Sequence, residues 1–214
     1  AEIIRPILRG RDIRRYGCDF ADQWLINTHN GIKEKGISPI DIDDYPAIKS
    51  HLDQYFPRLV ARADRGDTPY NLRNCAYMED FFGPKLLWAE TMRIHQKSSE
   101  RFPRFGFDEK GEFLTDKTCF FATGRDIDYI LVFLNSRVGK YLISKYVSVL
   151  DDGGFLMQKI YLEKIPIPEP DPSSLKKLKS ILKAGNIEAS QDSIDEILFR
   201  LLGLNEEETN YVRR

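Results

Sequence analysis

Two short patterns in this sequence contain residue types that could carry out chemistry. Gly106 and Gly111 have the spacing of a phosphate-binding loop, but Glu112 stands where that loop needs a lysine, and its carboxylate would repel a phosphate. Asp108 and Lys110 have the local D-x-K arrangement that a nuclease places around Mg²⁺. They fall in a predicted surface turn that ends at Gly111, so we favour a plain charged turn and keep a small Mg²⁺-dependent nuclease as an alternative.

Other patterns for catalysis or metal binding are absent from the sequence. No two glycines have the G-x-G spacing of a dinucleotide-binding turn, and no G-x-S-x-G motif for a serine nucleophile occurs. The 3 cysteines and 3 histidines are scattered, with no C-x-x-C or H-E-x-x-H grouping, which argues against a zinc site and a disulfide framework. We therefore predict no catalytic residue and no metal site in this chain.

Arginine-rich stretches are the strongest candidates for a binding site. The net charge is −1, but residues 1–15 contain 5 arginines against 2 acids, and residues 137–183 contain 9 basic against 5 acidic residues. An acidic tail from residue 186 onward, with 7 acids against 3 arginines, hides this more basic body. In residues 9–17, glycines allow the backbone to approach a ligand closely while arginines project from it. This pattern predicts either phosphate contact or a solvated basic turn.

Two further groups of basic residues are candidates for contacts with a ligand. Arg58, Arg62 and Arg65 follow one another at spacings of four and three, so they would share one face of a helix, which could also be an ordinary solvated face. Lys85 stands beside an otherwise apolar strand and needs a partner there, which makes it a candidate contact. Trp88 in the same strand is interpreted as a core residue.

Hydrophobic periodicity and turn residues predict the elements that must position these side chains. Short apolar segments bounded by turn residues predict strands over residues 3–8, 23–28, 84–88, 105–107, 112–114 and 118–121, and a further strand that carries Gln158, Lys159 and Tyr161. Apolar residues at helical spacing predict helices that begin at Pro46, run from Asp126 to Leu134, cover residues 141–146, follow Ser173 and cover residues 194–202.

Alternating prolines divide the chain near residue 168. They stand at positions 166, 168, 170 and 172 and form a stiff exit from the preceding part. We predict a first domain over residues 1–168 and a helical C-terminal extension over residues 169–214. Every apolar run is broken by charge well before the ~20 residues that a bilayer span needs, and no secretion signal is visible. We expect a cytoplasmic protein without membrane contact.

Five motifs resemble, in order, the target recognition (specificity) domain of TaqI-type adenine methyltransferases from type II and IIG restriction-modification systems. They are LRGRDIRRYG at residues 8–17, YPAIKSHL at 45–52, PKLLW at 84–88, LNS at 134–136 and KIYLEKIPIP at 159–168. The resemblance implies a mixed α/β (α+β) fold. It would have a twisted, mostly antiparallel sheet, flanking helices and a helical C-terminal extension.

The resemblance also implies that the chain binds double-stranded DNA and reads its base sequence. Phosphate contacts fix the position of such a protein, and side chains at base edges supply the specificity. The residues expected to clamp the DNA backbone are Arg9, Arg11, Arg14, Arg15, Arg62, Arg65 and Arg73. Those expected at base edges are Lys85, Arg93, Gln158 and Lys159. Lys140 and Asn135 are further DNA-binding candidates, although an asparagine at a helix end is often only a cap.

The chemistry itself is expected outside this chain. An adenine methyltransferase needs a glycine-rich turn for S-adenosylmethionine and an (Asp/Asn)-Pro-Pro-(Tyr/Phe) loop for the flipped base, and this sequence has neither. The resemblance implies a methyltransferase domain in the same polypeptide, which would bind S-adenosylmethionine, and in some family members a nuclease. The alternatives are a specificity subunit of a multi-subunit restriction system and a protein-interaction domain that uses the aromatic patch at residues 77–82.

Overall fold

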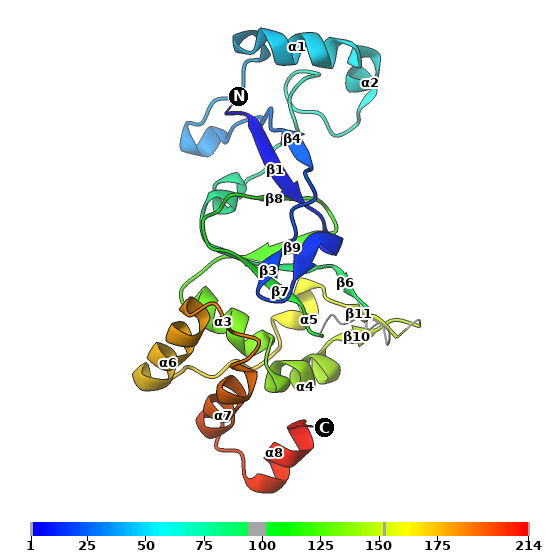
Figure 1. Ribbon diagram of the computed structural model, residues 1–214. Helices are drawn as coiled ribbons and strands as arrows, with labels where there is room; N and C mark the ends of the chain where they lie inside the picture. Colours follow the sequence, from blue (N-terminus) through cyan, green and yellow to red (C-terminus); the bar gives the residue numbers. More distant parts are fainter. Residues whose placement is uncertain (1, 94–101, 152, 214) are drawn as a thin grey trace.

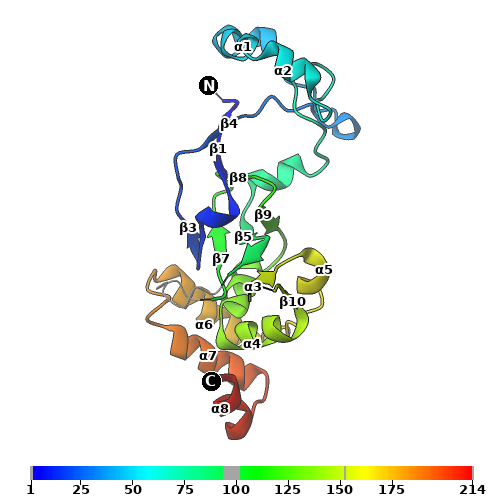
Figure 2. The same ribbon diagram turned by 90° about the vertical axis from the view of Figure 1, so that its right-hand side faces the viewer.

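Small sheets in the middle of the molecule separate helices at its two ends. The computed structural model describes residues 2–93, 102–151 and 153–213. Figure 1 and Figure 2 show an elongated arrangement in which α1 (Pro46–Asp53) and α2 (Phe56–Ala61) lie at one end and α8 (Glu206–Arg213) lies at the other.

β5 (Lys85–Ala89) is the central strand of the main sheet. It pairs antiparallel with β7 (Phe105–Asp108) on one side and with β9 (Cys119–Ala122) on the other. Its sequence KLLWA lacks polar alternation, and its first four residues are all buried, as expected for a strand covered on both faces. Trp88 is confirmed as a core residue: it is 6% exposed, and its indole N–H donates a hydrogen bond of 2.8 Å to the carbonyl of Met157.

The other strands form three smaller sheets. In spatial order these are β4 (Trp24–Ile26), β1 (Ile4–Leu8) and β8 (Leu114–Thr115); β10 (Ser148–Val149), β11 (Phe155–Leu156) and β6 (Thr91–Met92); and the hairpin of β2 (Ile13–Arg14) with β3 (Gly17–Cys18). Within the described residues the β1–β8 pair is parallel and the other named pairs are antiparallel. The predicted mixed α/β, mostly antiparallel fold is therefore confirmed.

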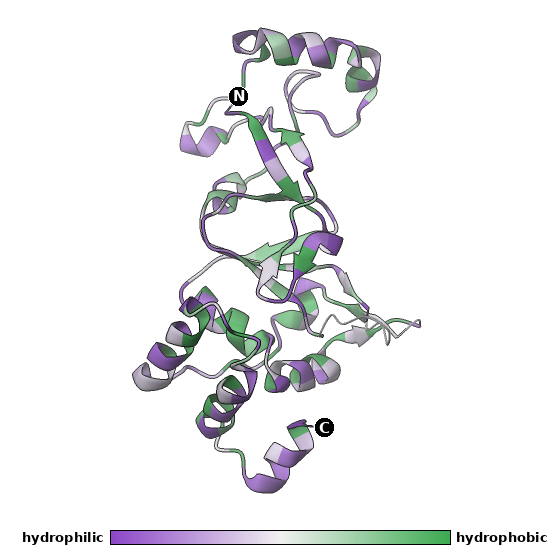
Figure 3. Cartoon of the chain, in the orientation of Figure 1, coloured by the Kyte–Doolittle hydropathy of each residue, from purple (hydrophilic) through white to green (hydrophobic). Residues whose placement is uncertain are grey.

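α3 (Ile127–Leu134) supplies the centre of the hydrophobic core. Its sequence IDYILVFL is apolar almost all round, which is typical of a buried helix, and both Leu131 and Phe133 are 0% exposed. It packs against β5, β7, α4 (Arg137–Tyr146) and α6 (Pro172–Lys183). Figure 3 shows that hydrophobic residues are frequent in the central sheet and in α3, whereas α8 is mostly hydrophilic.

The helices after residue 168 pack into the same core. α6 and α7 (Gln191–Leu201) bury Leu178, Ile194 and Leu198 completely, and full burial of one such side chain contributes about 2 kcal/mol. Both helices were predicted, but α6 is capped by Asp171, whose carboxylate accepts the N–H groups of the two serines expected to cap it. α8 was not predicted. None of the helices in the described ranges is both long and apolar enough to cross a membrane.

Two local predictions were wrong. The segment expected to be a strand with Gln158 and Lys159 is a short helix, α5 (Lys159–Leu162), because the N–H groups of Leu162 and Glu163 bond back to the carbonyls of Gln158 and Lys159. The expected arginine face of Arg58, Arg62 and Arg65 does not form, because α2 ends at Ala61 and the backbone at Arg62 is extended.

Candidate nucleic-acid interface

Arginines from three separate stretches line one groove, which we call the arginine groove. Its volume is about 680 Å³, and it lies between the loop after β1, the end of β6 and the residue before β7. The charged residues that line it are Arg9, Arg11, Arg14, Arg93, Arg104, Glu90 and Asp116. Five positive charges against two negative charges give a local excess of +3. A groove of this charge can bind an anion such as a phosphate.

An ion pair within the first arginine loop fixes its shape. The guanidinium of Arg9 grips the carboxylate of Asp12 with two hydrogen bonds of 2.9 and 3.0 Å, and the backbone N–H of Arg9 donates a third of 2.9 Å. Burial tends to raise the pKa of Asp12, but the hydrogen bonds from Arg9 outweigh it and lower that pKa below its usual value. The charge of Arg9 is thus largely used within the protein, although Arg9 lines the groove.

Gly10 allows this loop to lie directly on the main sheet. Its N–H donates to the Thr118 hydroxyl at 2.9 Å, and a Cβ at this position would lie 2.4 Å from the Thr118 carbonyl oxygen. The close backbone approach expected at the loop glycines is therefore made to the protein itself at Gly10. The consequence is a loop held rigidly while its other arginines project.

Arg11 and Arg14 present charge to the groove. Arg11 is exposed, and no residue in the described ranges is seen to pair with its guanidinium. Arg14 donates to the Asp19 carboxylate at 2.8 Å and to the Arg11 carbonyl at 2.7 Å. The Arg14–Asp19 pair lies in solvent, where an ion pair contributes little and is easily exchanged.

Arg93 and Arg104 line a second part of the groove, which we call its β7 side. The guanidinium of Arg104 donates two hydrogen bonds of 3.2 Å to the main-chain carbonyl of Arg93, so the two residues are held together. Arg93 was predicted at a base edge, and Arg104 was missed. Nothing in the residues around Arg104 marks it, because its place in the groove depends on β7 lying beside the arginine loop.

Lys85 is one candidate that the structure removes from the surface. Its side chain is 0% exposed, and its ammonium donates to the carbonyl of Phe81 at 2.7 Å and to the carboxylate of Asp108 at 2.5 Å. Burial lowers the pKa of Lys85 against the opposing effect of Asp108. A base contact by Lys85 is wrong for this conformation, because the amine is enclosed and paired.

Asp108 is equally engaged at the end of β7, whereas Glu109 and Lys110 form the expected exposed turn. Besides Lys85, it accepts the N–H groups of Glu112 at 3.1 Å and Phe113 at 2.9 Å, and so organises the turn that follows β7. The carboxylate oxygens of Asp108 are therefore occupied by hydrogen bonds within the protein. Within the described ranges no group of three or more His, Cys, Asp or Glu side chains is placed to hold a metal ion.

Arg15 and Asn135 also lie inside the protein. The Arg15 side chain is 10% exposed and donates to the main-chain oxygen of Asn135 at 2.5 Å and to the amide oxygen of Gln191. Asn135 is 1% exposed, and its amide makes one hydrogen bond to the N–H and one to the carbonyl of Phe105. The expectation that these two residues touch DNA directly is corrected, since both side chains are largely buried and bonded within the protein.

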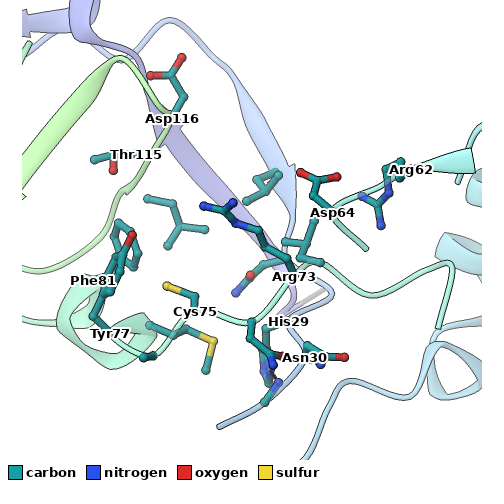
Figure 4. A pocket seen from close by; sticks show the side chains of 18 residues that line it. His29, Asn30, Arg62, Asp64, Arg73, Cys75, Tyr77, Phe81, Thr115 and Asp116 are labelled. Carbon is teal, nitrogen blue, oxygen red and sulfur yellow. Dashed lines mark hydrogen bonds between the residues drawn. The ribbon is translucent and has the colours of Figure 1, made fainter. Parts of the chain in front are cut away.

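Arg62, Arg65 and Arg73 do not line the groove; Arg62 and Arg73 line a second cavity of about 520 Å³. Arg62 donates to the carbonyls of Pro69 at 3.2 Å and Asn71 at 2.8 Å, and Arg65 donates to a carbonyl of α2. Figure 4 shows the guanidinium of Arg73 directed toward the middle of the cavity. The structure thus does not bring these three arginines together with the first loop.

The remaining candidates lie near the groove or on α4. Gln158 caps the start of α5 and Lys159 is exposed in its first turn, and the neighbouring Met157 N–H donates to the carbonyl of Glu90 at 2.8 Å. Glu90 lines the groove, so α5 begins close to its edge. Lys140 is exposed on α4, beside a separate hollow of about 360 Å³.

Two comparisons show which known proteins the chain is similar to. The family model described as the TaqI-like C-terminal specificity domain matches residues 5–167. A curated relative, the type II methyltransferase M.BstVI of Geobacillus stearothermophilus, is 23% identical over 217 residues, which cover 99% of this chain and 36% of the relative. The chain therefore spans about a third of the length of that relative.

Proposed function

The chain belongs to the family of TaqI-like C-terminal specificity domains, and from this premise we propose that it is a DNA target recognition domain. It binds duplex DNA along the arginine groove and selects the base sequence at which a methyltransferase acts. The methylation chemistry belongs to a part of a longer protein that this chain does not include.

The observation that carries the proposal is the convergence of five arginines from three stretches on one groove. Guanidinium groups match the geometry of phosphate oxygens, and phosphate contacts supply most of the affinity of a protein for DNA. The ion pair of Arg9 with Asp12 and the contact of Gly10 with Thr118 hold the loop in place beforehand. A loop that is already ordered loses less entropy when it binds.

Different residues of the interface have different roles in this proposal. Arg11, Arg14 and Arg104 contact phosphates, because these arginines line the groove. Base edges are assigned in this proposal to Arg93, which follows β6, and to Gln158 and Lys159 at the start of α5. Arginine or lysine at guanine and glutamine at adenine are the pairings that such side chains make in the major groove.

The partner is inferred from the relative. Because M.BstVI is named a type II methyltransferase, we infer that a methyltransferase domain of the same polypeptide accompanies this chain. From the motif resemblance we further propose that this domain acts on adenine in cytoplasmic DNA and uses S-adenosylmethionine. No residue of this chain is assigned to that cofactor. A restriction nuclease linked to the same recognition domain is compatible with this arrangement.

Binding of a labelled DNA duplex at several salt concentrations tests the proposal. Arg11→Ala should weaken binding about equally for all sequences and reduce the slope of log affinity against log salt by about 1, because one phosphate contact is lost. Arg200→Ala, which removes an exposed arginine of α7 outside the groove, is the charge-matched control and should leave the slope unchanged. Affinity that does not depend on salt, or equal effects of the two variants, would contradict the proposal.

A further inference from the structure

The two sides of the arginine groove come from parts of the chain that are far apart in sequence. Arg14 belongs to the hairpin of β2 and β3, and Arg104 directly precedes β7. Both must reach the same DNA backbone if the groove binds it. Their relative position therefore decides how many phosphates can be contacted at once.

These two sides meet at the first residues of β7. The backbone N–H of Tyr16 donates to the carbonyl of Phe105 at 2.7 Å. One residue further on, a Cβ at Gly106 would lie 2.3 Å from the carbonyl oxygen of Gly17, so no other residue type fits there without a shift. The hairpin and β7 are thus in direct backbone contact, and any shift between them moves Arg14 relative to Arg104.

Asn135 closes this junction from the interior. It follows α3 and is 1% exposed. Its amide accepts the N–H of Phe105 at 3.0 Å and donates to the carbonyl of Phe105 at 2.8 Å, which is the pair of bonds that a neighbouring strand would make. Because Phe105 is on the edge of its sheet, Asn135 replaces the missing strand at the residue next to Arg104.

The same residue also holds the hairpin. Its main-chain oxygen accepts a hydrogen bond of 2.5 Å from the guanidinium of Arg15, the neighbour of Arg14. Arg15 is further fixed by the amide oxygen of Gln191 on α7 and by Glu188 at 3.4 Å. Asn135 therefore bonds to both sides of the groove, through its side chain on one and through its backbone on the other.

We propose that Asn135 is a positioning residue for DNA binding, which sets the distance between the Arg14 and Arg104 sides of the groove. This inference rests on the proposed function of the groove. In this proposal Asn135 itself does not contact DNA. Without the Asn135 amide, Phe105 at the start of β7 loses both hydrogen bonds to the junction of α3 and α4. Arg104 then no longer contacts the DNA backbone together with Arg14.

The neighbouring Ser136 provides a matched control. It is also 1% exposed and also makes two hydrogen bonds, donating to the carbonyl of Phe133 at 2.6 Å and accepting the N–H of Gly139 at 3.0 Å. Both bonds remain within the junction of α3 and α4. Loss of Ser136 should therefore destabilise the same junction without touching either side of the groove.

The experiment compares Asn135→Ala and Ser136→Ala in the 214-residue chain. Thermal unfolding is measured first, and duplex DNA binding is then measured as a function of salt at a temperature where both variants are folded. Both should unfold at lower temperature than the unmodified chain. Asn135→Ala should bind DNA about tenfold more weakly at 0.1 M salt, with a salt slope smaller by about 1 to 2, as expected when one or two phosphate contacts are lost. Ser136→Ala should keep the slope of the unmodified chain.

Equal slopes for the two variants overturn the inference and leave the proposed function intact. An unmodified chain whose DNA binding does not depend on salt overturns the proposed function, and the inference with it. If Asn135→Ala does not fold, Asn135→Ser takes its place, because it adds no buried charge and its shorter side chain cannot make both bonds to Phe105. Its salt slope should fall in the same way, and an unchanged slope overturns the inference.

Discussion

The arginine groove and the centre of the main sheet use basic side chains in opposite ways. In the groove, Arg11 is exposed and Arg14 holds Asp19 in a solvent-exposed pair. In the central strand β5, Lys85 is 0% exposed and is bound to Asp108 and a backbone carbonyl. The difference teaches that a basic residue is available to a ligand only where the fold leaves its side chain at the surface. Basic character in the sequence does not decide this.

The largest effect that separates the two regions is expected at Lys85. Lys85→Met keeps the length of the side chain but leaves the carboxylate of Asp108 buried without its cation. Breaking a buried pair in this way costs about 3 to 5 kcal/mol of the free energy of unfolding. Urea denaturation followed by circular dichroism measures this change.

Lys110→Met is the control for the Lys85 variant, because Lys110 is exposed in the turn just after β7. A surface change of this kind should stay within about 0.5 kcal/mol. If Lys85→Met proves as stable as the unmodified chain and loses DNA binding instead, then Lys85 belongs with the groove and the comparison breaks down.

The sequence predicted those elements whose signals are local. The strand at residues 84–88 and the helix that ends at Leu134 were predicted correctly because unbroken apolar runs mark buried elements in any context. The segment of Lys159 failed because four residues of mixed polarity fit a strand or a helical turn equally well. There, the bond of the Met157 N–H to the carbonyl of Glu90 and the contact with α4 hold the segment, and neither neighbour can be seen from the segment itself.

The candidate site was harder to predict than the fold. Lys85 was chosen because a lysine in an apolar strand needs a partner, and the partner is Asp108, 23 residues away. Arg15 was grouped with Arg11 because they share a loop, yet it is held by Gln191, which lies 176 residues further on. Long-range pairing of this kind leaves no trace in a single sequence, so the fold could be predicted while the arginines that line the groove could not be separated from those bound inside the protein.

An intermediate effect is expected from pH at Asp12, which couples the groove to the stability of the fold. Arg9 lowers the pKa of Asp12 in the folded protein, so the carboxylate contributes stability above its unfolded pKa of about 4 and loses it as pH falls through the lower folded value. At pH 7, Asp12→Asn should therefore unfold at a lower urea concentration than the unmodified chain.

As pH falls through the lowered folded pKa of Asp12, this difference should shrink toward zero, because Asp12 then becomes protonated in the unmodified chain as well. Urea midpoints of both proteins between pH 7 and pH 2 test this, and the difference between the two removes the effect of the other carboxylates. A gap that stays constant over this range would mean that the Arg9–Asp12 pair does not hold the arginine loop.

The smallest effect, and the finest test of the comparison, is expected at Asp19. Its side chain is 69% exposed and pairs with Arg14, which is 37% exposed, so Asp19→Asn should change the free energy of unfolding by less than about 1 kcal/mol. The same substitution removes a negative charge beside the groove and a competitor for the guanidinium of Arg14. DNA affinity should therefore rise, by about twofold to threefold at low salt, and the gain should fade as salt screens the charge.

Asp44→Asn, which removes an exposed carboxylate just before α1, matches the change in net charge and should leave the affinity unchanged. A gain that is equal in both variants would show that net charge alone raises affinity. A gain confined to Asp19→Asn means that Arg14 exchanges its solvent-exposed pair with Asp19 for a contact with DNA. Lys85 cannot make such an exchange, because its pair with Asp108 is buried.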